Sequence, residues 1–201
     1  MKQIIVIFII SLLMACNSGT EKDSQNNPEE KATESAQVNP KKAPAKTTNK
    51  GTYLCKINGE DWAYTKASGI VSTHAKTKER TALITFKRKL EKGSEHIQLH
   101  YDANTFELIK TSLQLKFKNK DGKLFTCYYE ISPQLKKHSP QSTMSGTIDI
   151  SNASSASGTA EIINLNIRYE KGKLFDSKNA IVNLTDLKFS GVGYSDTDKP
   201  F

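Results

Sequence analysis

The stretch His96-Ile97-Gln98-Leu99-His100-Tyr101 decides the fold class, because apolar and polar residues alternate along its whole length. Successive side chains of a β-strand point to opposite faces, so the apolar members would share one face and the polar members the other. That arrangement is typical of an antiparallel sheet with one buried and one solvated face. The stretch therefore predicts a half-buried strand.

The same alternation recurs in residues 113–118, 125–131 and 163–169. In the last of these, Ile163, Leu165, Ile167 and Tyr169 would form the apolar face. No segment shows a convincing helical periodicity. Short strands at this spacing predict an all-β domain over residues 51–201, built as a single antiparallel β-sandwich, with a small β-barrel as the alternative.

Turn-forming residues separate the predicted strands. Asn58-Gly59 is a strong signal for a two-residue hairpin, and Asn119-Lys120-Asp121-Gly122 would join two alternating strands. Both turns connect segments that are neighbours in the sequence. They therefore predict two antiparallel hairpins.

The apolar pattern slips by one position inside the last predicted strand. Its first apolar pair is Val182 and Leu184, and its second pair is Leu187 and Phe189. The two pairs would fall on opposite faces of a regular strand. A β-bulge near Thr185-Asp186 would explain the change.

The first residues have the layout of a secretory signal. Lys2 precedes an apolar run that begins at Ile4 and ends with the small residue Ala15. The run is short for a membrane-spanning helix, which needs about 20 apolar residues. We predict a signal peptide over residues 1–15.

Leu13-Met14-Ala15-Cys16 resembles the lipobox of bacterial lipoproteins, which has an aliphatic, a variable and a small residue before Cys. The resemblance implies that the Cys16 thiol carries a diacylglycerol and that Cys16 becomes the mature N-terminus. Several acyl chains hold a protein stably at a membrane. The expected location is the bacterial cell envelope, at the outer membrane, facing either the periplasm or the cell surface.

A polar segment follows the predicted lipid anchor. Residues 17–50 contain one large apolar side chain, Val38, and are rich in Asn, Ser, Thr, Glu, Lys, Ala and Pro. Such a composition cannot bury enough apolar surface to offset its ordering entropy. We predict a lipidated Cys16 and a disordered linker over residues 16–50.

The linker, the Asn58-Gly59 turn and Trp62 together resemble the N-terminal part of small Bacteroidetes-type lipoproteins of unknown function. This resemblance implies a compact β domain on the envelope and brings no catalytic residue. From the residues alone, Trp62 is expected to pack over the first hairpin as a core anchor. Stacking on a sugar is the alternative.

Cys55 and Cys127 remain once Cys16 is assigned to the lipid. An even number of cysteines in an exported domain favours a disulfide. We predict one between Cys55 and Cys127, across neighbouring strands or between sheets. Two buried thiols are the alternative.

No constellation of catalytic or metal-binding residues stands out. His96 and His100 would lie on one strand face about 13 Å apart, too far to share a metal ion, and are interpreted as exposed histidines. Asp196-Thr197-Asp198 has the residue types to contact a cation, near the C-terminus. No catalytic residue, cofactor or metal is assigned.

The chain is basic, with a formal net charge of +8. Its lysines are scattered through predicted strands and turns, which favours plain solubility, with attraction to anionic envelope polymers or lipid headgroups as the alternative. Export argues against a nucleic-acid partner.

These observations predict a non-enzymatic envelope lipoprotein whose β domain binds or scaffolds an envelope protein or a glycan. Two alternatives remain open. One is a structural or assembly partner of an envelope complex. The other is an envelope hydrolase whose site is dispersed along the sequence.

Overall fold

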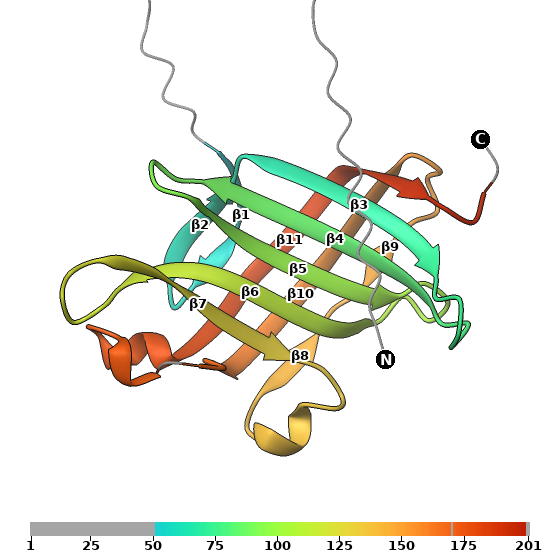
Figure 1. The fold of residues 1–201 in the computed structure, drawn as a ribbon. Coiled ribbons are helices and arrows are strands. Elements are labelled where there is room, and N and C mark those ends of the chain that lie inside the picture. The colour runs from blue at the N-terminus through green and yellow to red at the C-terminus, as the bar shows by residue number, and fades with distance from the viewer. Residues whose placement is uncertain (1–50, 170, 200–201) are drawn as a thin grey trace, which may run out of the picture. The chain divides into compact units, whose positions relative to one another are not determined.

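The computed structural model describes residues 51–169 and 171–199, which form a mainly-β domain (Figure 1). The predicted signal peptide, the predicted lipidation site Cys16 and the predicted linker lie outside the described residues. Within the described ranges, no helix has the length and apolar character needed to cross a membrane. The strands are β1 (Thr52–Ile57), β2 (Glu60–Tyr64), β3 (Lys66–Thr73), β4 (Arg80–Lys89), β5 (Ser94–Asp102), β6 (Leu108–Lys118), β7 (Leu124–Ile131), β8 (Thr143–Ser145), β9 (Ile148–Asp149), β10 (Ser155–Asn166) and β11 (Ile181–Asp196).

Three short 3-10 helices complete the described secondary structure. They are η1 (Lys136–His138), η2 (Lys171–Lys173) and η3 (Ser177–Ala180). The first lies in the connection after β7, and the other two lie between β10 and β11.

The strands form one large mixed sheet with the order β2-β1-β11-β3-β4-β5-β6-β7, and β10 pairs with β11, β8 and β9. The expectation of a purely antiparallel sheet is wrong at one place, because β11 runs parallel to β3, with Ser195 opposite Ile70. The reason is the length of β11. Its first part pairs with β1, with Ile57 opposite Leu184, and its last part continues past β1 to reach β3.

The sheet folds over on itself, so that β3 to β7 face β1, β10 and β11 across the core (Figure 1). The ring of Phe86 on β4 lies 5.3 Å from that of Phe189 on β11. The Tyr101 hydroxyl on β5 donates a hydrogen bond of 3.0 Å to the carbonyl oxygen of Thr159 on β10. Aromatic side chains therefore link the two sections of the sheet through the interior.

The alternation that predicted the fold class is confirmed in β5. Ile97, Leu99 and Tyr101 are fully buried, whereas His96, Gln98 and His100 are half-buried on the outer face. The same period places Leu113 and Leu115 of β6 in the core.

Both predicted hairpins are present. Asn58 and Gly59 have positive φ angles of 51° and 87°, the conformation of a type I′ turn, between β1 and β2. The Asn58 side chain also reaches β11, where its Oδ1 accepts a hydrogen bond of 2.8 Å from the Asn183 amide. The predicted turn over residues 119–122 joins β6 and β7, and Gly122 there has a φ of 76°.

The bulge predicted near Thr185-Asp186 is confirmed. Ala160 pairs with Leu187 and Ile162 with Leu184, so two residues of β11 lie opposite Glu161. Asp186 has a φ of 58°. The extra residue returns Leu187 to the same buried side as Leu184, so that both apolar pairs reach the core.

The apolar face predicted for residues 163–169 is confirmed at Leu165, which is buried, and at Ile167, which packs against the core, and is wrong at Tyr169. Asn164 has a φ of 56°, and the register of β10 against β11 shifts between Ile162 and Leu165. These two residues enter the core, whereas Tyr169 is 62% exposed. The irregular backbone at Asn164 breaks the period-two pattern between Ile162 and Leu165, and the exposed Tyr169 lies beyond Asn166, where β10 ends.

Candidate ligand pocket

A pocket of about 580 Å³ opens beside β7, between the connection that follows this strand and the chain that follows β10. Its lining combines charged, amide, hydroxyl and aromatic side chains: Glu130, Leu135, His138, Ser139, Pro140, Gln141, Asn166, Ile167, Arg168 and Tyr169. A concave site with a few convergent polar groups is the usual form of a small-ligand site.

Backbone contacts bring the two walls of the pocket together. Ile167 forms an isolated bridge with Tyr129 on β7, and the Arg168 amide donates a hydrogen bond of 2.8 Å to the Tyr128 carbonyl. On the other wall, the buried Ser142 hydroxyl donates a bond of 2.6 Å to the Asn164 carbonyl. The pocket is therefore framed by hydrogen-bonded backbone.

Glu130 and Arg168 supply the charges of the pocket. The Glu130 carboxylate lies 2.7 Å from Lys110 Nζ and 3.9 Å from Arg168 Nη1. The Arg168 guanidinium lies 5.5 Å from the centre of the Tyr169 ring, within cation–π range. This stacking holds an exposed aromatic ring beside a cation at the rim, an arrangement suited to a polar ligand with an apolar face.

Trp62 lies elsewhere, inside the domain, and is 2% exposed. Its Nε1 donates a hydrogen bond of 2.9 Å to Glu95 Oε2, and the Arg88 guanidinium lies 5.3 Å from its ring centre. The interpretation of Trp62 as a core anchor is confirmed. Sugar stacking by its ring is wrong, because burial leaves no free face.

Glu95 is a buried carboxylate that the sequence interpretation missed. Its Oε2 also accepts a bond of 2.7 Å from Arg88 Nε, and its Oε1 accepts one of 2.9 Å from the Lys116 amide. Both oxygens are thus occupied, which suits a structural role beside a second, smaller pocket of about 240 Å³. The alternation of β5 contained the signal, since Glu95 is in phase with the core residue Ile97.

Cys55 and Cys127 are both buried, and no disulfide joins them in the structure. Burial raises the pKa of the Cys55 thiol to about 12, against a smaller lowering by Arg88. The structure therefore differs from the predicted disulfide and corresponds to the alternative of two buried cysteines, which chemical modification can test.

His96 and His100 lie on the outer face of β5, as predicted, but both are half-buried and not exposed. Ser94 Oγ lies 2.9 Å from His96 Nε2. Burial lowers the pKa of both imidazoles, assisted by Lys87 at His96 and by Lys110 at His100, where Glu130 opposes the shift. In the part of the chain that the structure describes, no group of three His, Cys, Asp or Glu side chains is placed to hold a metal ion.

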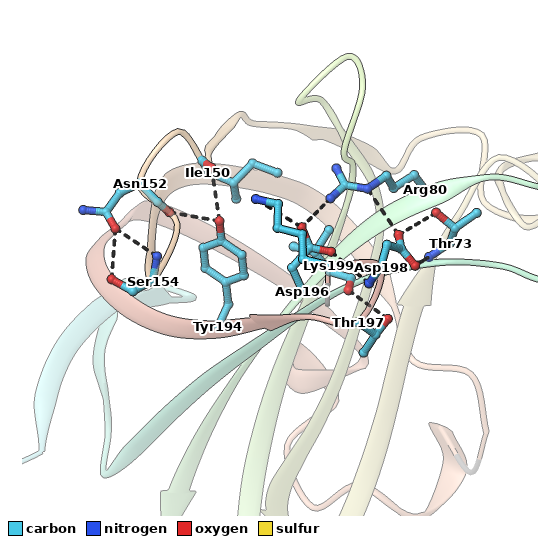
Figure 2. Close-up of polar contacts among 11 residues, drawn as sticks. Thr73, Arg80, Ile150, Asn152, Ser154, Tyr194, Asp196, Thr197, Asp198 and Lys199 are labelled. Carbon is cyan, nitrogen blue, oxygen red and sulfur yellow. Dashed lines mark hydrogen bonds and ion pairs between the residues drawn. The ribbon is translucent and has the colours of Figure 1, made fainter. Parts of the chain in front are cut away.

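The carboxylates of Asp196-Thr197-Asp198 contact side chains of β3 and β4 (Figure 2). Arg80 Nη2 lies 2.6 Å from Asp196 Oδ2, and Arg80 Nε lies 3.3 Å from Asp198 Oδ2. The Thr73 hydroxyl donates a bond of 2.7 Å to Asp198. The cation contact that the sequence suggested is thus made by the Arg80 guanidinium, which attaches the end of β11 to the sheet.

Three comparisons with known proteins identified no protein similar to this chain. Protein-family models, curated proteins and solved structures were compared with the chain, and none matched. The geometry of the residues described above therefore carries the functional argument.

Proposed function

We propose that this chain is a lipid-anchored protein of the bacterial cell envelope whose β domain binds a glycan, without catalysis, in the pocket beside β7. The lipobox-like residues 13–16 support the anchor. The observation that carries the binding role is the exposed Tyr169 ring stacked against Arg168 at the rim of a polar pocket.

The chemistry of the pocket matches a sugar ring. Sugar C–H groups pack on an aromatic face, and sugar hydroxyls exchange hydrogen bonds with amides, guanidinium and carboxylate groups. Tyr169, Asn166 and Arg168 offer these groups on one wall, and Gln141 offers an amide from the other. Lys110 and Arg168 contact the Glu130 carboxylate, so it is bound as an ion pair and serves best as a fixed acceptor.

A glycan array probed with the full chain in detergent tests the binding role. We expect binding to at least one envelope glycan, and Tyr169→Ala should weaken it about tenfold or more, as loss of a central aromatic contact does. Tyr53→Ala is the matched control, because Tyr53 is an exposed tyrosine on β1 outside this pocket. Glycan binding that is unchanged in Tyr169→Ala would contradict the role of this pocket and favour the scaffolding alternative. The same holds if the chain binds no glycan and co-purifies with a stoichiometric protein partner.

The anchor has its own test. Cells supplied with a labelled fatty acid should label the chain, and Cys16→Ala should abolish both the label and the membrane association. Label retained on the variant would contradict the assignment. Trypsin treatment of intact cells then distinguishes a surface-facing from a periplasmic domain, since the linker holds six lysines from Lys22 to Lys50.

We also infer that the domain is a β-sandwich and not a small closed barrel. Support comes from β7, the last strand of the order, which meets the chain at the end of β10 through one isolated bridge, Tyr129–Ile167, with its Arg168–Tyr128 hydrogen bond, and not through a continuous register.

A further inference from the structure

A continuous row of polar side chains crosses the outer face of the sheet and ends at the pocket. The strand registers place Lys66 opposite Lys87, Lys87 opposite His96, His96 opposite Gln114, and Gln114 opposite Tyr128. The hydrogen bond from the Arg168 amide to the Tyr128 carbonyl continues the row into the pocket rim. We name this row, from Lys66 through Lys87, His96, Gln114 and Tyr128 to Arg168, the cationic stripe.

The domain does not neutralise Lys66 and Lys87 at one end of the stripe, whereas Arg168 at the other end shares the Glu130 carboxylate with Lys110. Lys66 and Lys87 are exposed and lie directly across from one another, a like-charge pair that is unfavourable in a sheet. Within residues 51–169 and 171–199, neither lysine has an ion pair. An anion bound from outside would relieve this repulsion.

Neighbouring residues strengthen the positive character. Lys89 lies two positions after Lys87 on β4 and pairs with Ser94. Lys116 lies two positions after Gln114 on β6 and pairs with Thr126, to whose hydroxyl its Nζ donates a hydrogen bond of 2.7 Å. The nearby carboxylates do not offset these charges, because Glu95 is buried under Arg88 and Glu130 is paired with Lys110.

The uncharged members of the surface favour a polysaccharide over a nucleic acid. Gln114 lies within the stripe, and Gln98 and Ser112 form the adjacent row, where Ser112 Oγ donates a bond of 3.1 Å to Gln98 Oε1. Amides and hydroxyls suit sugar hydroxyls. Single-stranded nucleic acids are instead held by successive stacking aromatics, and the stripe contains one aromatic residue, Tyr128.

We propose that the ligand is an acidic polysaccharide that lies across the strands along the cationic stripe and places one sugar in the pocket at Tyr169. This inference rests on the proposed function, whose pocket forms one end of the stripe. It adds the chemical class of the ligand, a chain with repeated anionic groups, and the direction in which the ligand runs.

The test uses the full chain in detergent with a labelled oligogalacturonate and its uncharged methyl-esterified counterpart as probes. The acidic probe should bind more tightly, with an affinity that falls as salt is added. Lys66→Gln combined with Lys87→Gln should weaken its binding at least about tenfold, since each basic residue near an anionic surface contributes about fivefold in affinity. Lys76→Gln combined with Lys188→Gln removes the same charge from the β3–β4 connection and from β11, and should leave binding unchanged.

The outcomes separate the two proposals. Tyr169-dependent binding that is equal for both probes and insensitive to the Lys66 and Lys87 substitutions would overturn the acidic ligand and keep the glycan pocket. Binding that depends on the lysines and not on Tyr169 would overturn the pocket and keep the stripe. Tighter binding of a single-stranded oligonucleotide, lost in Tyr128→Ala, would replace the polysaccharide with a nucleic acid.

Discussion

The indole of Trp62 on β2 donates a hydrogen bond of 2.9 Å to the carboxylate of Glu95 on β5, and both side chains are buried. The two residues come from opposite sections of the folded sheet. Arg88 completes the contact, because its guanidinium binds the same carboxylate oxygen and lies over the indole ring. A charged group thus joins the two sections at a place where the alternation of β5 would suggest an apolar residue.

Replacing the carboxylate of Glu95 should destabilise the domain. In Glu95→Gln, the side-chain NH₂ is a donor and would face other donors, either those of Trp62 and Arg88 or the Lys116 amide. Arg88 would also lose its counter-charge. We expect the free energy of unfolding to fall by about 3 kcal/mol, as for a broken buried ion pair. Urea denaturation followed by tryptophan fluorescence measures this change. Glu91→Gln, an exposed residue between β4 and β5, is the control, and equal stability of both variants would contradict the role of Glu95.

Thr111 has a buried hydroxyl for which the described residues provide no hydrogen-bond partner. In Thr111→Val, a methyl group replaces this hydroxyl at nearly the same volume. We expect the free energy of unfolding to rise by about 1 kcal/mol. Ser142→Ala is the converse variant, because the buried Ser142 hydroxyl is bonded to the Asn164 carbonyl, and it should lower stability by about 1 kcal/mol. A loss of stability in Thr111→Val would show that the hydroxyl has a partner in solution.

Because of His100, the free energy of unfolding should fall when the pH is lowered mildly. Burial first, and Lys110 second, lower the pKa of its imidazole, while Glu130 acts in the opposite direction. The unfolded chain therefore takes up this proton at a higher pH than the folded domain does, so stability is full above the unfolded pKa of about 6.5 and is lost as the pH drops below it. Urea denaturation at pH of about 7.5 and 5.5 should show a smaller acid loss in His100→Gln than in the wild type. An identical pH dependence would contradict the lowered pKa.

Cysteine alkylation tests the state of Cys55 and Cys127. In the folded domain, both should resist iodoacetamide, because they are buried and the pKa of Cys55 is raised to about 12. In denaturant without reductant, the structure leads us to expect alkylation of both residues, read by mass spectrometry. Alkylation only after reduction would establish the disulfide that the cysteine count suggests.

The strands and hairpins were predictable from local patterns. The buried face of β5 follows from the period of two, and the turn at Asn58-Gly59 follows from the tolerance of both residues for positive φ. The bulge at Thr185-Asp186 was also visible as a slip in the apolar pattern. These features depend on residues close in the sequence, whose conformational preferences act before any long-range contact forms.

The candidate site was not predictable in the same way. Tyr169 was expected on an apolar face, but β10 ends at Asn166, and the Tyr169 ring is exposed at a pocket rim beside Arg168. Trp62 was located correctly as a core residue, but its partner Glu95 is 33 positions away in the sequence. The pairing of Trp62 with Glu95 has no signature in the spacing of residues, and the adjacency of Arg168 and Tyr169 does not reveal the pocket beside them.

The amino-acid sequence by itself determined the β class, the positions of the hairpins and the bulge, because side-chain periodicity and turn conformations are local properties. Only the tertiary structure decided the parallel pairing of β11 with β3, the pairing of Glu95 with Trp62, and the alignment of Lys66, Lys87 and Tyr128 in one row. Each of these depends on the register between strands that are distant in the sequence, which the packing of the shared core selects.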